Sequence, residues 1–145
     1  MILDTNFLID IDANRPDAIE KAREIEDAGV PRRVPHVVVF ELWTAVGKGS
    51  ETEANRGKFE RVLDGLPRAE TTDAIVKRAG EIEGRVQAAD PNDGGVGVAD
   101  AVIAATAVHV GEPVVTDDGD FRRRIKEQAN VDALEIEEYA YSACR

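Results

Sequence analysis

Short apolar runs alternate with longer stretches of helical periodicity along this chain, and this alternation limits the fold more than any other feature. The runs MIL at 1–3 and PVV at 113–115 have strand length. Between them, apolar residues recur at helical spacing over 16–29, over 53–66 and from 73 onward. Strands that alternate with helices form a parallel sheet covered on both faces. We therefore expect an α/β fold, with residues 1–145 as a single domain.

The remaining segments complete this pattern. The stretch RRVPHVVVFELWTAVGKG begins extended and becomes helical, and RAETT has the character of a short strand. The loop ADPNDGGVG precedes a helix of small residues, VADAVIAATAVHVG. A basic helix is expected at RRRIKEQA and a final edge strand at VDALEIEEY.

Acidic and polar residues follow the two clearest strands. Asp4 comes directly after MIL, and Thr116, Asp117, Asp118 and Asp120 follow PVV. Ligands of open parallel sheets bind beyond the carboxyl ends of the strands. The sequence therefore places these side chains at the edge of the sheet where a site is expected.

Two further acids stand in strongly apolar surroundings. Glu41 lies within VVVFELWTAV, and Asp100 lies within VGVADAVIAATAV. No nearby basic residue shares the helical face of either acid. Charged side chains are seldom buried unless they are paired or bind a metal ion. Mg²⁺ prefers carboxylate oxygens, and a pair of such ions can support phosphodiester cleavage.

Each acid also has an ordinary structural explanation. Asp4 could cap a helix through backbone N–H groups, and Asp100 could cap the helix after Gly97. Glu41 could face solvent on an otherwise buried helix. The acids of TDDGD could be turn formers, and Asn6 could satisfy backbone groups at the strand end. The metal interpretation rests on the four acids taken together.

Composition excludes several classes of protein. The net charge of −11 argues against a nucleic-acid binder with a broad basic face. It is typical of proteins from salt-accumulating cytoplasm, or alternatively of an acidic protein with a basic partner. The single cysteine, Cys144, allows no internal disulfide, and two histidines with one cysteine offer no zinc site. Neither a signal peptide nor a membrane-spanning run is evident, so we expect a cytoplasmic protein without a membrane partner.

The motifs LDTN, FEL, VADAVIAATA and VTDDGDF together resemble the four motifs of PIN-domain ribonucleases, and most of all the toxins of VapBC toxin–antitoxin modules. The resemblance covers essentially the whole chain. It implies a three-layer α/β/α sandwich with a central, mostly parallel sheet. It also implies an endoribonuclease that depends on Mg²⁺ or Mn²⁺ and hydrolyses RNA as the toxin of a type II system.

The resemblance also assigns roles to individual residues. Asp4, Glu41 and Asp100 would be the main metal-binding catalytic acids, and Asp118 would be the fourth, with Asp120 a further candidate ligand. Asn6 and Thr116 match supporting polar positions. The partners it implies are RNA, a small antitoxin and a second copy of the chain in a homodimer.

Arg122, Arg123 and Arg124 directly follow the fourth motif. They could form a phosphate clamp for RNA or simply a solvated helix face. Competing functions for the whole chain are a processing or DNA-directed nuclease of the same fold, a receiver-type phosphotransfer domain, and a non-catalytic binding module that keeps the fold.

Overall fold

The computed structural model describes residues 1–140, and Cys144 lies outside this part of the chain. Five short strands are all paired in parallel, as the sequence predicts. They are β1 (Ile2–Leu3), β2 (Val34–Pro35), β3 (Arg68–Ala69), β4 (Val114–Thr116) and β5 (Ile136–Glu138). One sheet has the order β1-β4-β5 and the other pairs β2 with β3. A parallel bridge between Ile2 and Arg33 brings the two sheets together.

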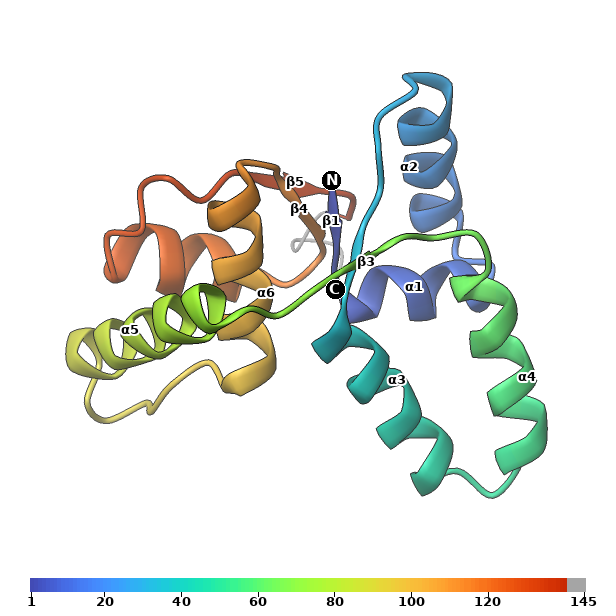
Figure 1. Cartoon of the computed structure of the whole chain (residues 1–145), viewed down its shortest axis with the longest axis horizontal. Helices are drawn as coiled ribbons and strands as arrows, with labels where there is room; N and C mark the ends of the chain where they lie inside the picture. Colours follow the sequence, from blue (N-terminus) through green and yellow to red (C-terminus); the bar gives the residue numbers. More distant parts are fainter. Residues whose placement is uncertain (141–145) are drawn as a thin grey trace.

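Helices cover both faces of this sheet (Figure 1). On one side lie α1 (Thr5–Asp12), α2 (Pro16–Asp27), α3 (His36–Lys48) and α4 (Thr52–Leu63). On the other lie α5 (Asp73–Ala89), α6 (Val98–Val110) and η1 (Phe121–Gln128). The expected α/β/α sandwich is confirmed. Within residues 1–140, no helix is long and apolar enough to span a bilayer.

The small residues of α6 explain how this helix enters the core. Every residue from Ala101 to Ala107 is buried, and most of them are alanine. Small side chains allow a helix to approach its neighbours closely, and α6 packs against both α5 and β1. The first turn of α6 is thereby held next to the carboxyl end of β1.

Three elements differ from the sequence prediction. Helix α1 was not expected, although Asp4 caps it and Phe7 and Leu8 bury one face. The basic segment forms a π-helix, η1, in place of an ordinary α-helix. Helix α4 ends at Leu63, earlier than expected, because the chain turns at Gly65 with a φ of +74°.

Candidate metal centre

Asp4 caps a helix and also contacts the end of a neighbouring strand. It is the N-cap of α1, and its Oδ1 accepts the Thr5 N–H at 2.8 Å. Its Oδ2 accepts the hydroxyl of Thr116 at 2.6 Å, so the side chain is also held against the end of β4. Asp4 is only 4% exposed. A capping role therefore does not remove Asp4 from the site.

Burial raises the pKa of Asp4 to about 7. The hydrogen bonds from Thr116 and from the Thr5 N–H oppose this rise, whereas the negative charges of Asp118 and Glu41 add to it. A carboxyl group with this pKa is easily neutralised, either by a proton or by a cation.

The polar turn after β4 is joined to Asp4 by a series of hydrogen bonds. Thr116 Oγ1 accepts the Asp118 N–H at 3.0 Å while donating to Asp4. Asp118 Oδ1 in turn accepts the Asp120 N–H at 2.9 Å. Thr116 thus connects Asp4 to this turn, and its role as a supporting residue of the site stays a prediction. Asp118 is the acid of this turn that is tied to Asp4 through a single intermediate side chain.

Asn6 of α1 and Asp120 of the turn make their side-chain contacts at the surface. The Asn6 amide is exposed and donates to Asp117 Oδ1 at a long 3.5 Å. Asp120 pairs with Arg123 at 3.1 Å. Asn6 therefore lies beside the site, where its contact is weak in geometry.

Glu41 faces the other acids. It lies in the second turn of α3, and its Oε1 accepts the hydroxyl of Thr5 at 2.5 Å. Its charge contributes to the raised pKa of both Asp4 and Asp100. The alternative of a purely solvent-facing Glu41 does not describe this arrangement. Thr5, the first residue of α1, is the residue that orients Glu41.

Asp100 is not the cap of its helix. The N-cap of α6 is Gly97, and no side chain caps this end, so Asp100 stands within the first turn. Burial, followed by the charges of four other acids, raises the pKa of Asp100 to about 8. These acids, from largest effect to smallest, are Asp4, Asp118, Glu41 and Asp120. The structure thus places close enough to interact electrostatically the acid that follows β1, one acid each from α3 and α6, and acids of the turn after β4.

The chemistry of this donor set fits a hard divalent cation. Carboxylate oxygens are the ligands that Mg²⁺ and Mn²⁺ prefer. Burial raises the pKa of Asp4 and Asp100, and the negative charges of the neighbouring acids add to this rise. Among residues 1–140, however, no three His, Cys, Asp or Glu side chains form a ready group around an ion. Asp4, Glu41, Asp100 and Asp118 therefore remain candidate ligands, chosen for their carboxylate chemistry and their electrostatic proximity, with Asp120 as a further candidate.

The three arginines after the fourth motif have different surroundings. Arg122 donates to Glu138 Oε1 at 2.8 Å, and Arg123 donates to Asp120. Arg124 is only 11% exposed and bonds to the carbonyl oxygens of Gly94 and Gly95. The structure therefore favours a structural role for Arg124, whereas Arg122 and Arg123 lie nearer to solvent.

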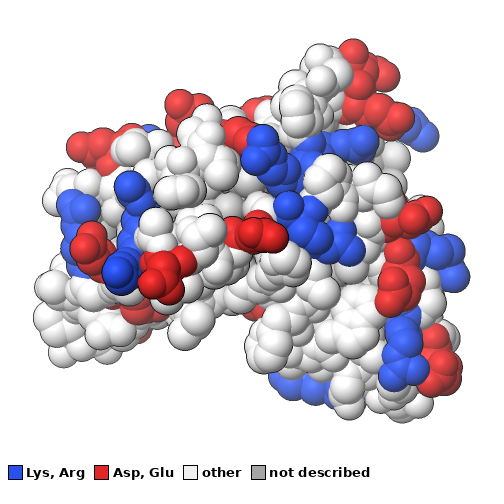
Figure 2. Space-filling model, in the orientation of Figure 1, with Lys and Arg blue, Asp and Glu red and all other residues white. Residues whose placement is uncertain are grey.

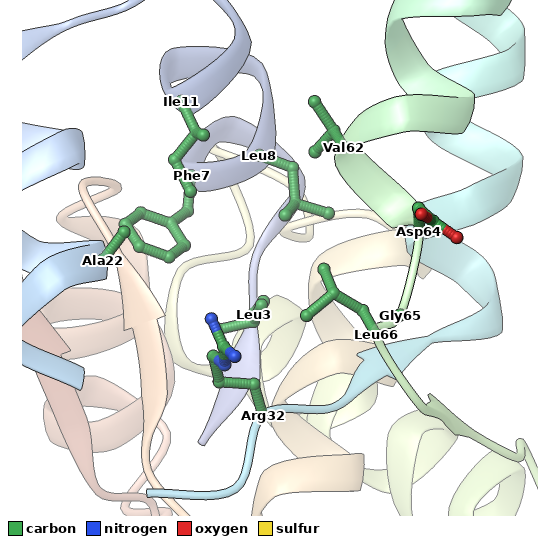
Figure 3. A pocket seen from close by; sticks show the side chains of 10 residues that line it. All are labelled: Leu3, Phe7, Leu8, Ile11, Ala22, Arg32, Val62, Asp64, Gly65 and Leu66. Carbon is green, nitrogen blue, oxygen red and sulfur yellow. The ribbon is translucent and has the colours of Figure 1, made fainter. Parts of the chain in front are cut away.

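A separate hollow of about 360 Å³ lies between α1, α2 and α4 (Figure 3). Its wall is mostly apolar, and Figure 3 shows Phe7, Leu8 and Val62 around it with the guanidinium of Arg32 at its lower side. None of the acids of the candidate metal centre lines it. The sequence offered no signal for this hollow, because its walls come from four distant segments.

The fold and the acids at its strand ends define a class of protein, and the comparison of families agrees. The PIN-domain family matches residues 1–127, so this chain belongs to the PIN-domain family. A receiver-type phosphotransfer domain is thereby set aside. None of the curated protein sequences matches the chain.

Solved structures show that the chain is VapC-like in its fold. VapBC2 from Rickettsia felis, bound to a promoter DNA fragment, matches with a TM-score of 0.76 at 21% identity, over 96% of this chain and 98% of that chain. DNA-bound VapBC from Salmonella typhimurium matches with a TM-score of 0.75 at 22% identity, over 96% and 97%. VapBC-1 from nontypeable Haemophilus influenzae matches with a TM-score of 0.69 at 18% identity, over 95% of this chain and 96% of that chain.

Proposed function

We propose that this protein is a metal-dependent endoribonuclease and the toxin of a type II toxin–antitoxin module. The observation that carries the proposal is that Asp4, Glu41, Asp100 and Asp118 come from four separate segments and act on one another electrostatically. Burial raises the pKa of Asp4 and Asp100, and the charges of the neighbouring acids add to that rise. Membership of the PIN family and the VapC-like fold support the same activity.

In this proposal the acids hold Mg²⁺ or Mn²⁺. When bound, such an ion activates water for attack on phosphorus and stabilises the leaving oxygen. Asp4 and Asp100 give up the protons that their raised pKa values allow them to hold near neutral pH. Thr116 and Thr5 keep Asp4 and Glu41 oriented through the hydrogen bonds described above. No Ser, Cys or His nucleophile is required.

The distribution of charge supports recognition through the metal centre. On the face shown in Figure 2, basic and acidic side chains are interspersed and do not separate into one broad basic surface. With a net charge of −11, attraction of RNA by bulk charge is weak. Arg122 and Arg123, both partly engaged with acids, are the candidates for added phosphate contacts near the site.

We expect the protein to cleave a mixed RNA pool only with Mg²⁺ or Mn²⁺, and the products to carry 5′-phosphate and 3′-hydroxyl ends. Attack by water at phosphorus leaves these ends, whereas attack by the ribose hydroxyl would leave a 2′,3′-cyclic phosphate. The assay compares wild type, Asp4→Asn and the exposed control Asp27→Asn, with DNA of the same sequence as a second substrate. Cleavage that persists in chelator, or cyclic phosphate ends, would contradict the mechanism. Preference for DNA would favour a DNA-directed nuclease.

The partner proposed for this chain is a small antitoxin. The matched structures are VapBC complexes, which supports a partner of the same kind here. The hollow between α1, α2 and α4 offers an apolar wall and one guanidinium, at Arg32, to such a partner (Figure 3).

We also propose a homodimer. Val76 and Val98 are 52% and 75% exposed, and both line a largely apolar hollow of about 370 Å³ between α5 and α6. A second copy would remove these side chains from water. We expect light scattering to give twice the mass of the chain and Val76→Asp to shift it toward the monomer. Ala74→Asp places the same charge elsewhere on α5 and should leave the mass unchanged. A wild-type monomer in molar KCl would contradict the dimer.

A further inference from the structure

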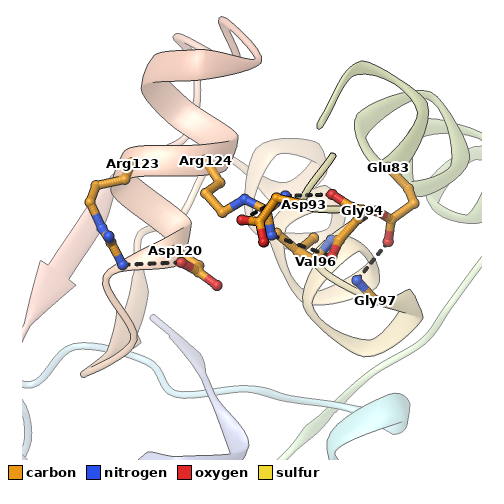
Figure 4. A network of polar contacts seen from close by, with 9 residues as sticks. Glu83, Asp93, Gly94, Val96, Gly97, Asp120, Arg123 and Arg124 are labelled. Carbon is orange, nitrogen blue, oxygen red and sulfur yellow. Dashed lines mark hydrogen bonds and ion pairs between the residues drawn. The ribbon is translucent and has the colours of Figure 1, made fainter. Parts of the chain in front are cut away.

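The loop before α6 is held from one side by a partly exposed carboxylate, Glu83, a contact that the sequence did not reveal. Glu83 lies on α5, and its carboxylate accepts two consecutive backbone N–H groups (Figure 4). Oε1 accepts the Val96 N–H at 2.9 Å, and Oε2 accepts the Gly97 N–H at 2.7 Å. Gly97 is the N-cap of α6, so Glu83 bonds directly to the residue at which this helix begins.

A basic side chain holds the same loop from the other side. Arg124 reaches from η1 to the carbonyl oxygens of Gly94 and Gly95, and it lies 3.8 Å from Asp93 Oδ2 (Figure 4). Glu83 therefore accepts hydrogen bonds from N–H groups of the loop, and Arg124 donates hydrogen bonds to its carbonyl oxygens. We call Glu83, Arg124 and residues 93–97 the loop clamp.

The approach of Glu83 to the loop requires a glycine. A Cβ atom placed on Gly95 would lie 1.7 Å from Glu83 Oε1 and 2.4 Å from its Cδ. The Glu83 carboxylate would have to leave its position, because real Cβ atoms do not come so close to another heavy atom. Gly95→Ala is thus a way to displace Glu83 without changing any charge.

The position of the Asp100 carboxylate depends on the backbone at the start of α6, whereas the other acids are also held by hydrogen bonds to their side chains. The Asp4 carboxylate accepts the Thr116 hydroxyl, the Asp118 carboxylate accepts the Asp120 N–H, and the Glu41 carboxylate accepts the Thr5 hydroxyl. The Asp100 carboxylate, in contrast, has no side-chain hydrogen bond or ion pair within residues 1–140. Its place in the site is therefore set by the backbone of the first turn of α6.

We propose that Glu83 and Arg124 are positioning residues for Asp100, because together they fix the loop from which α6 starts. This inference rests on the proposed function of the acids as a metal centre. It gives Arg124 a role inside the protein in place of a phosphate contact. Glu83 and Arg124 do not touch the metal or RNA, and they act only through the position of Asp100.

The test measures metal binding directly. Mn²⁺ binding is followed by the loss of the free Mn²⁺ signal in electron paramagnetic resonance, well below the melting temperature of each variant. We expect Glu83→Gln and Gly95→Ala each to weaken Mn²⁺ binding by about tenfold, the effect typical of residues that orient metal ligands. Glu81→Gln, the same change on the exposed side of α5, should bind Mn²⁺ as wild type does.

A double-mutant cycle separates positioning from a general effect on the fold. In the Asp100→Asn background, Glu83→Gln should change Mn²⁺ affinity by less than about twofold, because the residue through which it acts has been removed. A full tenfold loss in that background would overturn the inference, as would wild-type affinity in both Glu83→Gln and Gly95→Ala. If wild type binds no Mn²⁺, or Asp100→Asn binds it equally well, the proposed metal centre fails and the inference fails with it.

Discussion

Asp100→Asn should abolish RNA cleavage without destabilising the metal-free protein. Loss of a metal-binding carboxylate should reduce the rate more than about a hundredfold, because changes one shell further out already cost tenfold to a hundredfold. The free energy of unfolding of the metal-free protein, in contrast, should not decrease. Asp100 repels four neighbouring acids, and asparagine removes that charge while keeping nearly the same shape.

Urea unfolding at pH 8, in constant high KCl and chelator, measures the stability of wild type and Asp100→Asn without metal. We expect Asp100→Asn to be more stable than wild type by roughly 1–3 kcal/mol, since one pKa unit corresponds to about 1.4 kcal/mol and relaxation reduces the effect. The exposed Asp27→Asn serves as the control in both assays. A variant that unfolds clearly more easily than wild type would mean that Asp100 stabilises the fold.

Raising the pH should destabilise the metal-free protein. The pKa of Asp4 is about 7 and that of Asp100 is about 8 in the folded chain, against 3.8 for an unperturbed aspartate. Between pH 4 and pH 8 the folded state therefore binds more protons than the unfolded state, and stability falls as pH rises. The stabilisation is complete below pH 4 and is lost as pH passes through 7 and 8.

The expected loss from these two acids is roughly 2 kcal/mol or more between pH 5 and pH 8. Other carboxylates also titrate in acid, so the informative comparison is the slope of the free energy of unfolding against pH in wild type and in Asp100→Asn. This slope should be shallower in the variant. Saturating Mg²⁺ at pH 8 should restore about 2.7 kcal/mol to wild type at a hundredfold excess over its dissociation constant. Equal slopes in the two proteins would contradict the raised pKa of Asp100.

The expectation of acids at one sheet edge succeeded because it depended on local signals. Asp4 follows a short apolar strand, and Asp118 follows another, so parallel pairing alone places them near each other. Helix α1, in contrast, was not expected, because local signals do not separate it from the strand before it. Its eight residues follow the strand directly, and the apolar letters of MILDTNFLID do not show where one period ends and the next begins.

The sequence by itself determined the class of fold and the parallel strands, and it supplied the candidate acids, because period, strand length and charge in an apolar frame are all properties of short segments. Only the tertiary structure decided which contacts orient them. Thr5 meets Glu41 across 36 positions, Thr116 meets Asp4 across 112, and Glu83 reaches Gly97 across 14. Polar residues such as Glu83 and Arg124 carry no periodic signal, and their partners are backbone groups that any residue could supply. Their roles appear only when α5, α6 and η1 pack together.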